Sequence, residues 1–159
     1  MSYLRNYICA IAAFFSVVSV NAMAKCDPES ITDARLFQFT RDLSSSATAM
    51  RQASLSSPKD ADTVSELESV SRTLRREISS AQHAWRLHQR MVHPTDRDLL
   101  RQSFIYNMGN LKLEIDDSLS SLNTSIGAIR SAGIATLAVR MSDQVKELKQ
   151  YVNDCRSPG

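Results

Sequence analysis

Two cysteines, Cys26 and Cys155, stand near the two ends of the chain that follows an N-terminal apolar segment. A third cysteine, Cys9, lies inside that segment, so that removal of the segment would leave one pair. In an oxidising compartment such a pair is expected to form a disulfide. Closing a loop of roughly 130 residues would stabilise the fold by about 5 kcal/mol in the chain-entropy model. We therefore expect a fold whose two ends meet; two free or intermolecular thiols are the alternative.

Residues 1–24 have the three-part pattern of a cleavable export signal. Arg5 supplies a positive charge, an apolar run follows, and the small residues Ala22 and Ala24 precede the expected cleavage site. The apolar run is shorter than the ~20 residues that cross a bilayer as a helix, which argues against a permanent anchor. The pattern predicts a periplasmic or secreted protein.

The chain that remains after cleavage, residues 25–159, has the length of a single domain. Lys25 directly before Cys26 argues against processing as a lipoprotein, and no membrane span is expected after cleavage. The net charge of the whole chain is only +2, which does not favour binding to nucleic acid.

The spacing of apolar residues predicts an all-α fold. The sequence has four glycines and four prolines, and its apolar residues recur at steps of three and four without an alternation of period two. Helix-start signals occur at Asp27-Pro28, at Ser57-Pro58-Lys59-Asp60 and at His93-Pro94, and Asn123-Thr124-Ser125 offers a further N-cap. The expected helices span residues 28–56, 59–92, 95–122 and 125–155.

Four helices of similar length joined by short turns favour an up-down-up-down four-helix bundle. An even number of antiparallel helices brings both chain ends to the same pole, where Cys26 and Cys155 can form the disulfide. The turn between the third and fourth helices is the least defined, because Gly127 and Gly133 would allow it at residues 130–133 instead of 123–125. A three-helix bundle with one long kinked helix is the alternative.

Apolar stripes mark the face that each helix is expected to bury. The stripe of the second helix consists of Val64, Leu67, Val70, Leu74, Ile78, Ala81, Trp85, His88 and Val92. The third helix contributes Leu100, Phe104, Met108, Leu111, Ile115, Leu119 and Leu122. The fourth contributes Ile126, Ile129, Gly133, Leu137, Met141, Val145, Leu148, Val152 and Cys155. The first helix is less regular and is expected to bury Ile31, Ala34, Phe37, Thr40 or Arg41, Ala47 and Met50.

The polar residues do not form a pattern typical of an enzyme or a cofactor site. His83, His88 and His93 follow one another at steps of five, which turns each by about 140° from the last and keeps them from sharing a face as metal ligands. A C-x-x-C-H sequence for covalent haem attachment is absent. The acidic run at Glu114, Asp116 and Asp117 lies between core positions and is interpreted as the solvated side of the third helix. We expect no enzymatic activity, metal or cofactor.

A basic edge on the second helix is the strongest candidate for a binding site. Every basic side chain other than histidine between residues 72 and 101 is an arginine, and the arginines outnumber the acids there. Arginine is a preferred cation at interfaces, because its guanidinium group binds carboxylates through two hydrogen bonds. The same residues could instead be an ordinary solvated helix face. The expected partner-binding residues are Arg72, Arg75, Arg76, His83, Arg86, Leu87, Arg90 and His93.

Two functional hypotheses follow from these patterns. The first is an exported binding protein without enzymatic activity that docks a macromolecular partner, such as a secreted effector that it inhibits or an envelope assembly. Its partner would be a protein, and an acidic one suits the basic edge. The second is a periplasmic bundle that encloses haem, a metal or an apolar ligand in its interior. The interior would then be lined by Met50, Met108, Met141, Trp85 and His88.

Overall fold

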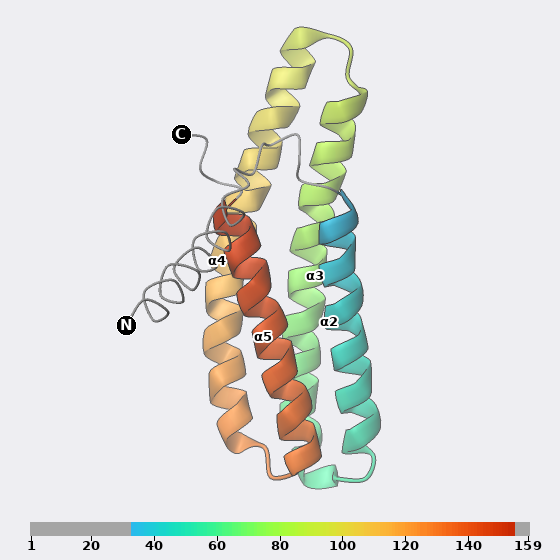
Figure 1. Cartoon of the computed structure of the whole chain (residues 1–159), viewed down its shortest axis with the longest axis vertical. Helices are drawn as coiled ribbons and strands as arrows, with labels where there is room; N and C mark the ends of the chain where they lie inside the picture. Colours follow the sequence, from blue (N-terminus) through green and yellow to red (C-terminus); the bar gives the residue numbers. More distant parts are fainter. Residues whose placement is uncertain (1–32, 155–159) are drawn as a thin grey trace, which may run out of the picture.

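The computed structural model describes residues 33–154, and long α-helices make up nearly all of this range (Figure 1). A short 3-10 helix precedes the second long helix. The elements are α2 (Asp33–Ser54), η2 (Pro58–Asp60), α3 (Ala61–Arg90), α4 (Pro94–Ala128) and α5 (Ala132–Asp154). The expected export signal and both cysteines of the expected disulfide, Cys26 and Cys155, lie outside the described residues.

The four long helices pack against one another around a common core. Helix α2 contacts α3 and α5, and α4 contacts the same two helices from the other side. The chain direction alternates from each helix to the next, so that the beginning of α2 and the end of α5 lie towards the same end of the bundle (Figure 1). The prediction of four packed helices is confirmed, and the three-helix alternative is wrong.

The core is a single cluster of apolar side chains drawn from all four helices. The fully buried large side chains are Leu36, Leu43, Met50, Leu67, Leu74, Ile78, Leu111, Ile115, Leu122, Ile134 and Met141. Burial of each aliphatic side chain of this size contributes about 1.5–3 kcal/mol. The stripes expected for α3 and α4 face this cluster with two exceptions. Val92 is 95% exposed because α3 ends at Arg90, and Leu100 is only partly buried and lies outside the cluster. In α5 the buried positions near its start are Ile134 and Ala138, whereas Gly133 is exposed and Leu137 is only partly buried.

The expected register of the first helix is wrong for its N-terminal half. The buried stripe of α2 runs through Leu36, Phe39 and Leu43, whereas Ala34 and Phe37 are exposed. The later expected positions, Ala47 and Met50, are buried, while Arg41 faces solvent and Thr40 is half-buried. A buried serine interrupts the apolar spacing of this stripe, so the stripe is hard to recognise in the sequence.

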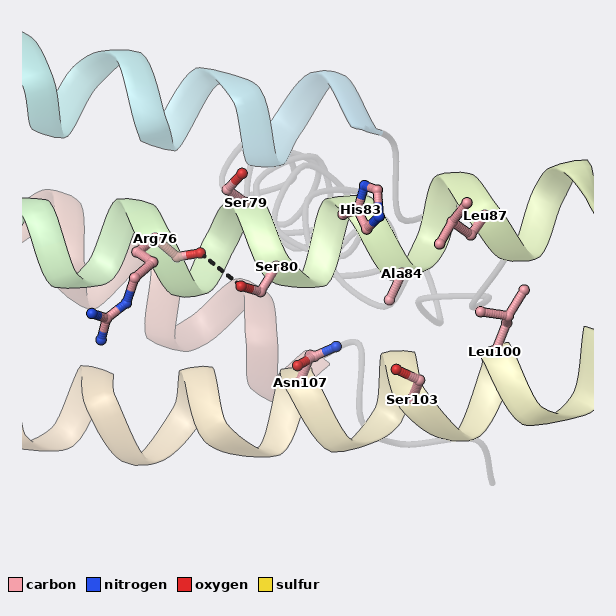
Figure 2. Close-up of a pocket in the computed structure, with 9 residues that line it drawn as sticks. All are labelled: Arg76, Ser79, Ser80, His83, Ala84, Leu87, Leu100, Ser103 and Asn107. Atoms are coloured by element: carbon pink, nitrogen blue, oxygen red, sulfur yellow. Dashed lines mark hydrogen bonds between the residues drawn. The ribbon is translucent and has the colours of Figure 1, made fainter.

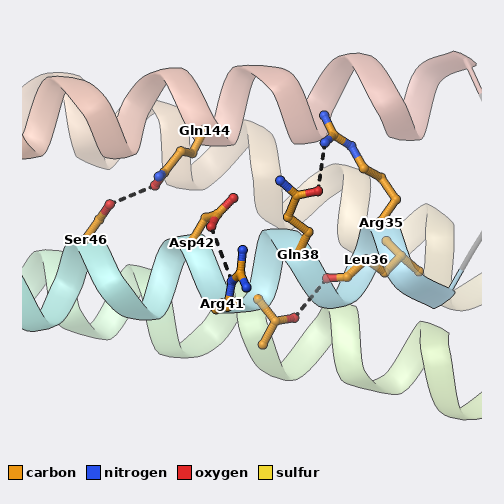
Figure 3. A network of polar contacts seen from close by, with 8 residues as sticks. Arg35, Leu36, Gln38, Arg41, Asp42, Ser46 and Gln144 are labelled. Carbon is orange, nitrogen blue, oxygen red and sulfur yellow. Dashed lines mark hydrogen bonds and ion pairs between the residues drawn. The ribbon is translucent and has the colours of Figure 1, made fainter.

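That serine is Ser46, which is buried between α2 and α5. Its hydroxyl donates a hydrogen bond of 2.9 Å to Oε1 of Gln144 (Figure 3). The bond satisfies a polar group that would otherwise be costly to bury. A polar residue can therefore occupy a core-facing position here because its partner comes from a helix that is distant in the sequence.

The expected N-cap at Asn123-Thr124-Ser125 does not begin a helix, since α4 continues through it to Ala128. Thr124 donates its hydroxyl to the carbonyl oxygen of Ser120 at 3.1 Å, one turn earlier in the same helix. Ser125 is buried, and its hydroxyl lies 3.4 Å from Oε2 of Glu66 on α3. Both hydroxyls are thus satisfied without interrupting the helix, and the turn falls at residues 129–131.

A buried aspartate holds this turn in place. The carboxylate of Asp60 accepts hydrogen bonds from the backbone N–H groups of Arg130 at 2.9 Å and Ser131 at 3.0 Å, and from the hydroxyl of Ser57 at 2.7 Å. The residue is only 1% exposed. These donors stabilise the charged form, so the Arg130 N–H and then the Ser57 hydroxyl lower the pKa of Asp60 below 3.8, against the opposing effect of burial. Asp60 therefore ties η2 to the α4–α5 turn.

Helices α3 and α4 continue well past the ends of α2 and α5 (Figure 1). They have 30 and 35 residues, against 22 and 23 in α2 and α5. Two contacts give the level of the ends: Arg75 of α3 bonds Ser44 of α2, and Lys149 of α5 pairs with Asp116 of α4. Counting along the helices at 1.5 Å per residue, the first residue of α2 lies near the level of residue 86 in α3. The last residue of α5 lies near the level of residue 111 in α4. We call residues 87–110 the α3–α4 extension.

Candidate functional site

An open groove of about 520 Å³ lies between α3 and α4, at the base of the α3–α4 extension (Figure 2). Six of its lining residues come from α3 and three from α4. They are Arg76, Ser79, Ser80, His83, Ala84, Leu87, Leu100, Ser103 and Asn107. The groove therefore combines a cation, an imidazole, hydroxyl and amide groups, and two leucines.

The polar and apolar parts of the groove are separated along its length (Figure 2). Arg76 is exposed at one end, and its Nε donates to Oε1 of Glu77 at 3.2 Å. Leu87 and Leu100 lie at the other end and are each partly exposed. Ser80 donates its hydroxyl to the carbonyl oxygen of Arg76 at 3.1 Å, which commits this hydroxyl to the helix. The groove offers a charged contact and an apolar contact to the same docking segment.

The structure brings three of the expected partner-binding residues into this groove: Arg76, His83 and Leu87. Arg72, Arg86 and Arg90 are exposed elsewhere on α3. Arg75 and His93 belong neither to the groove nor to the exposed basic edge of α3. Arg75 is half-buried and donates from Nη1 to the hydroxyl of Ser44 on α2 at 3.1 Å, and His93 lies in the turn that precedes α4.

The contribution of α4 to the groove was not anticipated. Leu100 has the spacing of a core residue and was assigned to the core, yet it is only partly buried and lines the groove. Ser103 and Asn107 follow it at steps of three and four, which places them on the same side of α4. That spacing was a usable signal, but it becomes informative only once the neighbour on that side of α4 is known.

The side chains named for an interior ligand site are packed into the core or its margin. Met50 and Met141 are fully buried, and Met108 packs against the core cluster. The ring of Trp85 is stacked on His88, with centroids 5.1 Å apart, and touches Phe104 at the same distance. Within residues 33–154, no group of three or more His, Cys, Asp or Glu side chains is placed to hold a metal ion. The interior-ligand hypothesis stays a prediction.

Comparison of the chain with protein-family models, with curated proteins and with solved structures finds no match. In the described part of the chain, no helix combines the length and the apolar character needed to cross a membrane.

Proposed function

We propose that this chain is an exported binding protein without enzymatic activity, and that it docks a protein partner along α3 with the α3–α4 groove at the centre of the contact. The observation that carries the proposal is the convergence of Arg76, His83 and Leu87 with Leu100 in one open groove. Protein interfaces are enriched in arginine beside apolar anchors, and this groove has both.

The chemistry of the α3 edge suits a partner segment with carboxylates. Arg72 and Arg90 are exposed on the same helix as Arg76, which extends the basic character along α3. A guanidinium group can bind a carboxylate through two hydrogen bonds, and the two leucines can receive an apolar side chain of the same segment. The groove walls are two long helices packed against each other, so little conformational freedom is lost on docking.

A matched pair of double variants tests the proposal. Arg76→Glu with Arg90→Glu reverses charge along the α3 edge, whereas Arg41→Glu with Arg140→Glu makes the same change on α2 and α5. The two double variants are matched, because Arg76 and Arg41 each form an ion pair with the residue that directly follows, Glu77 and Asp42 respectively. All four are exposed, so each variant is expected to change the free energy of unfolding by less than about 1 kcal/mol.

The readout is quantitative affinity purification from the envelope and the medium of the producing cells. A partner of this edge is recovered with the wild type and the α2/α5 variant, and its recovery with the α3 variant falls at least about tenfold, equivalent to 1.4 kcal/mol of binding free energy. Equal recovery of the same proteins with both double variants would reject the α3 edge as a docking site.

A further inference from the structure

Helix α4 carries a second apolar stripe on its outer face, in addition to the one that faces the core. Leu99, Tyr106 and Leu113 are 60%, 69% and 67% exposed. They are spaced seven residues apart, which places them in line along about 20 Å of one helix face. A helical wheel puts this line opposite the buried residues of α4, among them Phe104 and Ile115. A surface helix normally has one apolar face, so the outer face of α4 lacks a covering partner among the described residues.

A glycine lies on the same side of the helix. Gly109 falls between Tyr106 and Leu113, and a Cβ atom built on it would meet no atom within 4 Å. Packing among the described residues therefore does not require glycine, although glycine is less favourable than alanine inside a helix. A missing side chain does allow another backbone to approach closely. This observation is independent of the exposed stripe, and the open space at Gly109 leaves room for a close approach from outside.

The charge of the outer face identifies the kind of partner. The half of α4 centred on the stripe has no lysine or arginine, and its charged residues are Asp96, Asp98, Glu114, Asp116 and Asp117. Asp116 pairs with Lys149 at 2.8 Å, and Asp96 lies at the helix N-terminus, where a negative charge is favourable. Glu114 and Asp117 lie beside Leu113 without an ion pair to any residue between 33 and 154. Cations on a partner would complete the pairing.

A second copy of the chain does not fit this surface. If two α4 helices pair in parallel through the stripe, Glu114 of one copy faces the flank of Asp116 of the other. If they pair antiparallel about Tyr106, Asp98 of one copy approaches Asp116 of the other on the same flank. Both arrangements place carboxylates together, which is unfavourable. A helix with cations beside its apolar residues avoids that repulsion.

We propose that the outer face of α4 binds an amphipathic α-helix of another protein, whose apolar seam of heptad spacing lies on Leu99, Tyr106 and Leu113 and whose flanking lysine or arginine side chains pair with Glu114 and Asp117. This goes beyond the proposed docking edge on α3 and does not depend on it. The two surfaces have opposite charge and therefore select different segments.

The probe is a fluorescently labelled three-heptad peptide with leucine at its a and d positions and lysine at e and g. Repulsion between the lysines opposes pairing of the peptide with itself. A second peptide has glutamate in place of lysine. By fluorescence anisotropy, the purified protein is expected to bind the lysine peptide at least about tenfold more tightly than the glutamate peptide. The net charge of the protein is +2, so overall attraction does not account for such a preference.

Two triple variants locate the contact. Leu99→Gln, Tyr106→Gln and Leu113→Gln together remove the stripe, and binding of the lysine peptide is expected to weaken at least about tenfold. Phe37→Gln, Leu55→Gln and Val139→Gln remove three exposed apolar side chains from other parts of the surface and leave binding unchanged. Circular dichroism checks that both triple variants retain the helical fold. The Arg76→Glu, Arg90→Glu variant should bind the lysine peptide normally, which separates this surface from the one on α3.

Four outcomes overturn the proposal. The wild type fails to bind the lysine peptide, or binds it as well after the stripe is removed. Sedimentation of the protein alone reveals a dimer that the stripe variant loses, which identifies a second copy as the occupant. Phosphatidylglycerol vesicles bind the wild type but not the stripe variant, which identifies a lipid surface instead.

Discussion

The two ends of the helical bundle are built in different ways. At one end Asp60 is buried and accepts three hydrogen bonds, two of them from the α4–α5 turn, so that all the connections there are fixed by polar contacts. At the other end, residues 91–99, which form the α3–α4 turn and the start of α4, are all exposed, and His93 caps α4 without a side-chain hydrogen bond. We call the end with Asp60 the closed end, because Asp60 ties its two connections to each other, whereas the α3–α4 extension presents surface. Both candidate docking sites include residues of the extension.

The largest expected effect compares a core position with an exposed position on the same helix. Ile115 is fully buried in the core cluster, and Ile115→Ala is expected to lower the free energy of unfolding by about 2–5 kcal/mol. Leu99 lies in the extension, and Leu99→Ala is expected to change it by less than about 0.5 kcal/mol. Chemical denaturation followed by circular dichroism measures both. If Leu99→Ala lowered the free energy of unfolding by several kcal/mol, Leu99 would contribute to the core in the same way as Ile115, and the extension would not be a mainly exposed surface.

The closed end can be tested through the ionisation of Asp60. The folded-state pKa lies below 3.8, so the charged carboxylate stabilises the fold at pH values above 3.8, and this stabilisation is lost as the pH falls through the lower folded pKa. Asp60→Asn should therefore lower the midpoint of thermal unfolding at pH 7 by roughly 5 °C. Below pH 3.8 the difference between wild type and variant should narrow.

Thermal scans from pH 7 to pH 2 provide the measurement. Asp62→Asn is the control, because Asp62 is an exposed acid in the first turn of α3 and makes no hydrogen bond to residues 33–154. A gap between Asp60→Asn and wild type that stays constant down to pH 2 would show that the charge of Asp60 does not hold the turn.

Local sequence patterns predicted the parts of the fold that depend on neighbouring residues. The prolines at Pro58 and Pro94 lie at the helix starts where they were expected, and the periodic stripes of α3 and α4 face the core. These signals are complete within a few turns of helix, which is why they can be interpreted without a structure.

The parts that sequence analysis missed depend on contacts between distant residues. The register of α2 relies on a buried Ser46 whose partner, Gln144, is 98 positions away. The α4–α5 turn relies on Asp60, which looked only like part of a helix-start signal and binds backbone groups 70 and 71 positions away. The same limit applies to the groove. Three of its α3 residues, Arg76, His83 and Leu87, were among the expected partner-binding residues, whereas its α4 side was concealed because Leu100 has core spacing.

The smallest expected effect compares two glycines of α4. A Cβ at Gly109 or at Gly127 would meet nothing within 4 Å, so both tolerate alanine sterically. Gly109→Ala lies in the middle of the helix and should raise the free energy of unfolding by about 0.5–1 kcal/mol, whereas Gly127→Ala, in the last turn, should raise it less.

The two variants are also expected to differ in peptide binding, because Gly109 lies in the α3–α4 extension and Gly127 lies in the last turn of α4. If a helix approaches α4 closely at Gly109, Gly109→Ala stabilises the protein and yet weakens its hold on the lysine peptide, while Gly127→Ala leaves the peptide affinity unchanged. A gain in stability without a loss of affinity would mean that Gly109 is simply a weak position in the helix and that the partner does not approach there. A loss of stability in Gly109→Ala would instead mean that the glycine serves packing within the chain itself.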